Sequence, residues 1–197
     1  SLSPDLIVKG AIETHFDSMG IGVDLSAGVR EQNDYTVFVM GGRVGNKIHI
    51  IDCKRLRIMG NLEKLDALME MMEEWGVIHK DGKNYFPTGS SIHVWSEAVA
   101  YQASLEADFK RICLGDQGLY NVLWHPVKGF RGDKVARFRG IMGLFEQRNI
   151  IFNKYRKFTN LKDEIINFGV SSHDDCVDAL VWLCNGLMTR GKLELEY

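Results

Sequence analysis

The chain has 197 residues, of which 45% are hydrophobic and 25% charged, with 20 glycines and 3 prolines. These proportions are those of an ordinary globular protein and exclude a disordered, collagen-like or coiled-coil chain. The net charge of −2 excludes a uniformly basic nucleic-acid binder. No apolar run approaches the roughly 20 residues that a membrane-spanning helix needs, so we expect no membrane segment.

The length suits one compact domain. Because the sequence starts with Ser1 rather than Met, we expect residues 1–18 to lead in from a preceding domain and residues 19–197 to form the domain itself. The four cysteines contain no C-x-x-C pair. That pattern favours reduced, buried thiols over a zinc site or a disulfide framework.

Apolar periodicity predicts strands first and then an alternation of strands and helices. The strands we expect are residues 19–24, 35–40, 47–53, 91–96 and 119–125. The helices we expect are residues 2–16, 61–75, 99–112, 133–147 and 172–188. A glycine-rich loop at 41–46 would join the second and third strands into a hairpin. Asn61 would cap the second helix, and Pro126 would end the fifth strand. This order predicts an α/β fold: a mixed sheet of about five or more strands with helices on both faces.

Two carboxylates stand at the ends of expected strands. Asp24 ends the first strand, and Glu97 follows the fourth. Because neighbouring strand ends form the binding sites of open α/β sheets, these two side chains could converge. The alternatives are an ordinary loop acid at Asp24 and, at Glu97, a first-turn acid that interacts with the helix dipole.

A third group of acids, Asp174, Asp175 and Asp178, lies near the start of the last helix. Ser172 and Asp175 have the spacing of a capping box, which would account for acids at the helix start. Asp178 is expected beyond the first turn. Three carboxylates on one helix face repel each other unless a cation lies between them. Since hard divalent cations prefer oxygen ligands, the cluster favours a metal site.

Positive charge is concentrated in residues 128–157, which carry nine basic and two acidic side chains, a net +7 that leaves −9 on the remainder of the chain. Such a stretch suits a polyanion bound at one place. A solvated helix face is the alternative explanation.

Five short segments carry a family resemblance: Gly22–Ser26, Asn33–Val37, Trp95–Gln102, Asp133–Arg137 and His173–Leu180. In this order they resemble the nuclease domain of tailed-bacteriophage large terminases. The similarity extends over residues 19–188, and its most telling part is the His-Asp-Asp-x-x-Asp-Ala sequence that starts at His173. The resemblance implies a ribonuclease H-like fold, whose element order agrees with the predicted one.

The resemblance also implies a metal-dependent endonuclease that cuts concatemeric double-stranded viral DNA during genome packaging. The metal ligands and catalytic carboxylates it implies are Asp24, Glu97 and the acids of the last helix, first Asp175, then Asp178, with Asp174 and His173 in support. We expect two Mg²⁺ or Mn²⁺ ions, bridged by Asp24, because a pair of ions can activate water and stabilise the leaving oxygen.

The basic stretch would then contact DNA phosphates, which position the duplex without reading its sequence. The expected contacts are Lys128, Arg131, Lys134, Arg137 and Arg139. The resemblance further implies a small terminase subunit and a portal as partners, the cytoplasm of an infected bacterium as location, and a missing ATPase domain before residue 19. We expect the isolated domain to be monomeric. The alternatives are another ribonuclease H-like nuclease, such as a Holliday-junction resolvase or a transposase core, and a non-catalytic DNA-binding or assembly module.

Overall fold

The central feature of the fold is a mixed sheet. The computed structural model describes residues 7–8, 11–12, 16–25, 35–57, 60–75, 91–98, 100–112, 122–128, 134–170 and 174–195. Among them, six strands form a sheet in the order β7-β6-β3-β4-β5-β8. These strands are β3 (Ser18–Asp24), β4 (Thr36–Val44), β5 (Lys47–Leu56), β6 (Ile92–Glu97), β7 (Val122–Val127) and β8 (Ile150–Phe152). The contiguous β3, β4 and β5 pair antiparallel, whereas β6, β7 and β8 are added in parallel.

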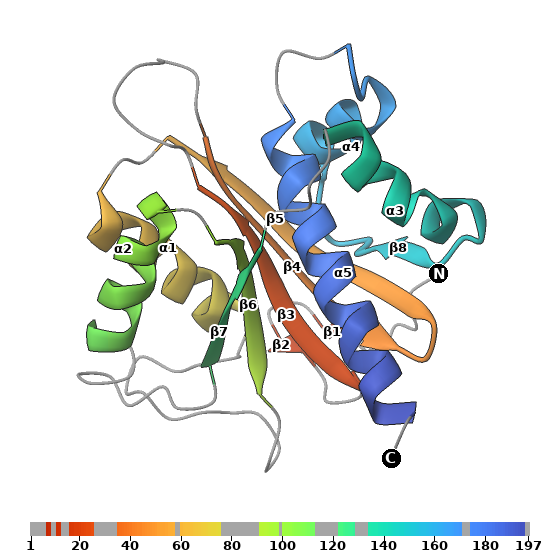
Figure 1. The fold of residues 1–197 in the computed structure, drawn as a ribbon. Coiled ribbons are helices and arrows are strands. Elements are labelled where there is room, and N and C mark those ends of the chain that lie inside the picture. Colours follow the sequence, from red (N-terminus) through yellow and green to blue (C-terminus); the bar gives the residue numbers. More distant parts are fainter. Residues whose placement is uncertain are drawn as a thin grey trace.

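Helices cover both faces of this sheet (Figure 1). On one face, α1 (Asn61–Glu74) and α2 (Ala100–Phe109) share an apolar core with the sheet. On the other face, α5 (Asp175–Leu195) crosses β3 and β4, with α3 (Lys134–Glu146) and α4 (Thr159–Ile166) beside it. The predicted mixed α/β sheet with helices on both faces is therefore confirmed.

The segment before the sheet differs from the prediction. We expected a helix over residues 2–16, but the described part of that range contains two short strands, β1 (Ile7–Val8) and β2 (Ala11–Ile12). They pair antiparallel with each other and form a separate small sheet. Ile7 pairs with Ile12 and Val8 with Ala11; a few apolar residues at helical spacing do not distinguish a helix from short paired strands.

The hairpin between β4 and β5 turns over two residues, Gly45 and Asn46, rather than over the loop expected at 41–46. Gly45 has φ of +57°, a conformation that favours glycine and suits a tight hairpin. Gly41 and Gly42 lie inside β4 instead. A side chain at Gly41 would come within 2.8 Å of the carbonyl oxygen of His49, so this glycine serves close packing rather than a turn.

Two further boundaries are corrected. Gly60, not Asn61, is the N-cap of α1, and the amide of Asn61 donates to Asp108 of α2 at 2.9 Å. Pro126 lies within β7 and does not end it. In the described sheet β7 is an edge strand, where the missing N–H of a proline is tolerated.

The compositional expectations can be checked on the described residues. None of their helices is both long and apolar enough to cross a membrane. Cys176 and Cys184 are buried free thiols, as expected, and Cys53 is a partly exposed free thiol. Cys113 lies outside the described residues.

Candidate functional site

Asp24 and Glu97 end two adjacent parallel strands. The register pairs Val23 of β3 with Ser96 of β6. The next residue of each strand is one of the two acids, so both acids lie at the carboxyl-terminal ends of neighbouring strands. Such strand ends are where open α/β sheets form their sites.

The glycines of β3 bring α5 very close to this strand. A Cβ on Gly22 would collide with the carbonyl oxygen of Ala179 and lie 2.8 Å from the amide nitrogen of Leu183. Because side chains alternate between the faces of a sheet, Gly22 and Asp24 belong to the same face. Asp24 therefore faces the first turn of α5, the turn that precedes Ala179.

The start of α5 differs from the prediction. Ser172, the expected cap, lies outside the described residues together with His173, and the helix begins at Asp175. Asp178 lies in the first turn and not beyond it. Both acids thus stand at a helix N-terminus, where the helix dipole favours negative charge.

The first turn of α5 is held by a residue that the sequence did not point to. The carboxylate of Glu164 in α4 accepts hydrogen bonds from the amides of Cys176 and Val177, at 2.8 and 3.2 Å. Glu164 is 3% exposed and also pairs with Arg55 of β5 at 3.3 Å. Glu164 therefore satisfies the free backbone N–H groups at the start of α5, the role that we expected a capping box of Ser172 and Asp175 to fill. The eight-residue α4 shows only a brief apolar pattern, so nothing in the sequence distinguished this acid from a solvated one.

The carboxyl group of Asp24 is influenced electrostatically by acids of two other elements, α5 and β6. Burial is the largest cause of a pKa of Asp24 well above its usual range, and the carboxylates of Asp178 and Asp175 raise it further. Glu97 acts in the same direction, more weakly. These interactions place the predicted carboxylates of β3, β6 and α5 in one electrostatic neighbourhood, as acids that repel each other.

Two basic side chains of α3 lie among these acids. The Nζ atom of Lys134 is 2.5 Å from an oxygen of Asp174 and 3.3 Å from an oxygen of Asp178. The guanidinium of Arg137 lies 3.5 Å from Asp178 and 3.8 Å from Glu97. Both residues were singled out above as DNA contacts. In this structure they face the carboxylates, which the charge pattern alone did not indicate.

The donor chemistry of the cluster suits a divalent cation, because carboxylate oxygens are the ligands that Mg²⁺ and Mn²⁺ prefer. As placed, however, no three acidic, histidine or cysteine side chains of the described residues are close enough together to hold an ion. The positive charge beside Asp178 comes from Lys134 and Arg137. The acids are therefore suitable ligands for a divalent cation, but in this structure their charge is offset by Lys134 and Arg137.

Two of the other expected DNA contacts are exposed to solvent. Lys128, directly after β7, and Arg139, on α3, are both exposed. Arg131 lies outside the described residues.

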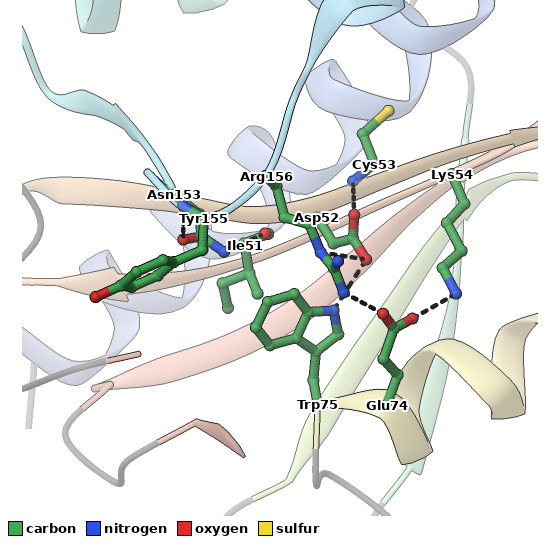
Figure 2. Close-up of polar contacts among 9 residues, drawn as sticks. All are labelled: Ile51, Asp52, Cys53, Lys54, Glu74, Trp75, Asn153, Tyr155 and Arg156. Atoms are coloured by element: carbon green, nitrogen blue, oxygen red, sulfur yellow. Dashed lines mark hydrogen bonds and ion pairs between the residues drawn. The ribbon is translucent and has the colours of Figure 1, made fainter. Parts of the chain in front are cut away.

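A second polar cluster lies on the α1 face of the sheet and is structural (Figure 2). Asp52 of β5 is 6% exposed and accepts a hydrogen bond from the indole of Trp75 at 2.9 Å. Arg156 lies 3.8 Å from Asp52 and pairs with Glu74, which also accepts from Lys54 at 2.7 Å. Each charged group in this cluster has an opposite partner, so the cluster ties α1 and the segment after β8 to β5.

A comparison with known protein families identifies the family of this domain. A family model described as the terminase RNase H-like domain matches residues 21–187, most of the chain. The chain belongs to this family. The predicted resemblance to terminase nuclease domains is therefore confirmed, and so is the ribonuclease H-like fold.

Solved structures agree on the fold of this terminase domain. The large terminase nuclease from the thermophilic phage G20c with bound zinc is 20% identical with a TM-score of 0.55, over 85% of this chain and 80% of that one. The same nuclease with bound magnesium is 18% identical with a TM-score of 0.55, over 85% of this chain and 80% of that one. The g2p nuclease domain from bacteriophage SPP1 with bound Mn is 14% identical with a TM-score of 0.52, over 87% and 88%. No curated protein matches the sequence.

Proposed function

We propose that the chain is a divalent-metal-dependent endonuclease that cuts double-stranded viral DNA during genome packaging. The observation that carries this proposal is geometric: Asp24 and Glu97 end adjacent parallel strands of a terminase-type ribonuclease H-like sheet, and Arg137 lies within 4 Å of both Glu97 and Asp178 of α5. Related nuclease domains were solved with bound magnesium, zinc or Mn, which supports metal binding by this domain.

The proposed metal ligands are drawn from Asp24, Glu97 and the acids at the start of α5, Asp175 and Asp178, with Asp174 in support. When bound, two divalent ions would supply an activated water and stabilise the leaving 3′ oxygen. Asp24 is the central residue of this set because it interacts with the acids of both neighbouring elements. Burial and the neighbouring acids raise the pKa of Asp24, and a bound cation would favour its carboxylate form.

The basic residues around the acids would orient the DNA. Lys134 and Arg137 lie directly at the carboxylates, and Lys128 and Arg139 lie exposed nearby in the sequence. Contacts of this kind bind phosphates and carry no sequence information, which suits a cutter of low sequence specificity. As part of a packaging machine, the domain would work with a small terminase subunit and a portal in the infected bacterial host.

A plasmid assay tests this function. Supercoiled plasmid should be nicked in the presence of Mg²⁺ or Mn²⁺ and remain intact in EDTA. Asp24→Ala should fold normally and lose at least about a hundredfold in nicking rate, since a carboxylate shared by the cluster cannot be replaced by a methyl group. Undiminished nicking by a folded Asp24→Ala protein would contradict the proposed site. No nicking and no metal binding by the wild-type protein would favour a non-catalytic DNA-binding module.

A further inference from the structure

We propose that Lys134 is an internal competitor of the catalytic cation: its ammonium binds Asp174 and Asp178, at the start of α5, until a divalent ion displaces it. This inference rests on the proposed function, because it concerns the metal of that same site. It assigns Lys134 a role in setting the metal affinity, as a positioning residue that acts through the carboxylates.

The contacts of Lys134 are those of a bound cation. Its Nζ atom lies between two carboxylates, 2.5 Å from Asp174 and 3.3 Å from Asp178. In this position the positive charge of the ammonium offsets the negative charge of the two carboxylates.

Lys134 and Arg137 differ in their freedom to leave. The side chain of Arg137 is 11% exposed, and its guanidinium lies 5.6 Å from the ring centre of Trp182 while contacting Glu97 and Asp178. The side chain of Lys134 is 48% exposed, at the first residue of α3. A lysine ammonium sits on a flexible four-carbon stem, whereas a packed arginine is held in place. Lys134 is thus the cation that can move away.

A divalent ion and this ammonium cannot share the same carboxylates. An ion bound by Asp178 would lie within a few ångströms of the Nζ atom, where like charges repel strongly in a partly buried site. Metal binding therefore requires the release of Lys134. The released ammonium can then pair with a DNA phosphate, whose negative charge replaces that of the two carboxylates. By linkage, a phosphate that draws Lys134 away must also favour metal binding.

Calorimetric titration with Mn²⁺ alone tests this competition. Lys134→Met removes the ammonium and keeps most of the length of the stem, and we expect it to bind Mn²⁺ about fivefold more tightly than the wild type, an effect of the size expected for a partly exposed pair. Lys134→Arg retains the charge and should keep an affinity close to that of the wild type. Lys110→Met is the matched control, because Lys110 follows α2 and pairs with Glu106 of that helix at 2.7 Å, away from the acids.

A melting experiment gives a second readout that does not depend on cleavage. In EDTA, Lys134→Met should melt at a lower temperature than the wild type, because its acids have lost their counter-charge. Saturating Mn²⁺ should then raise the melting temperature of the variant by more than that of the wild type. An unchanged or weakened Mn²⁺ affinity of a folded Lys134→Met protein would overturn the competition while leaving the proposed function intact. No Mn²⁺ binding by either protein would overturn both.

Discussion

At the scale of single residues, the fold places Asp24 where burial and neighbouring acids oppose its negative charge. Burial and the neighbouring acids raise its pKa in the folded protein, so the folded state binds this proton more tightly than the unfolded chain does. The stability that the proton contributes is complete below about pH 4, the ordinary value of an unfolded aspartate. It is lost as the pH rises through the raised folded pKa. Above the raised folded pKa, the metal-free fold therefore carries an unfavourable charge.

Asp24→Asn should relieve that charge. In EDTA at about pH 8 we expect the variant to melt a few degrees above the wild type, and the difference should vanish near pH 4, where Asp24 is protonated in the folded state. Thermal unfolding followed by circular dichroism between these pH values measures the effect. The control is Asp66→Asn, on the exposed side of α1. A variant less stable than the wild type at the higher pH would show that Asp24 is needed structurally as an anion.

At the scale of elements, the site depends on how closely α5 approaches β3. The same face of β3 carries Gly20, Gly22 and Asp24, and the absence of side chains at the two glycines lets Trp95 and the backbone of α5 lie against the strand. Glu164 holds the first turn of this helix from the other side. The acids of α5 are thus positioned by backbone contact and by one buried carboxylate, both independent of any metal.

Gly22→Ala tests the importance of that contact. The added methyl group meets the carbonyl of Ala179 and cannot be accommodated by moving a side chain. We expect a loss of about 2 to 3 kcal/mol in the free energy of unfolding, measured by urea denaturation. Gly140→Ala is the matched control. It adds the same methyl group in α3 where nothing lies within 4 Å, and should stabilise the helix by about 0.5 to 1 kcal/mol. Equal stability of the two variants would contradict close packing at Gly22.

At the scale of the whole molecule, most of the order of elements from β3 onward could be predicted from sequence. Apolar periodicity located the five longer strands of the sheet to within about four residues and the starts of α1, α2, α3 and α5 to within three, but it missed α4 and ended α5 at 188 instead of Leu195. The placement of Asp24 and Glu97 at strand ends followed from general α/β geometry. The hairpin turn was misplaced because Gly41 and Gly42 look the same in a turn and in a closely packed strand. Their role depends on His49, Phe16 and Leu183, which only the folded structure brings near.

The partners of the charged residues could not be predicted. A basic residue on an amphipathic helix has the same pattern whether it faces solvent, DNA or an acid. Lys134 and Arg137 face acids, and Arg156 pairs with Glu74 on the opposite face of the sheet. The net charge of +7 in residues 128–157 is therefore only partly available to a polyanion in the metal-free protein.

Two exposed residues of the basic stretch, Lys128 and Arg139, are expected to bind DNA phosphates. Lys128 and Arg139 are exposed, and each phosphate contact adds about 0.9 to the slope of log affinity against log salt concentration. Lys128→Ala combined with Arg139→Ala should weaken binding to a duplex oligonucleotide in EDTA and flatten that slope by up to about 2. Lys47→Ala combined with Lys110→Ala removes the same charge from the start of β5 and from the end of α2, and should leave the slope unchanged. Equal slopes for the two double variants would show that net charge alone, and not this surface, determines how the protein binds DNA.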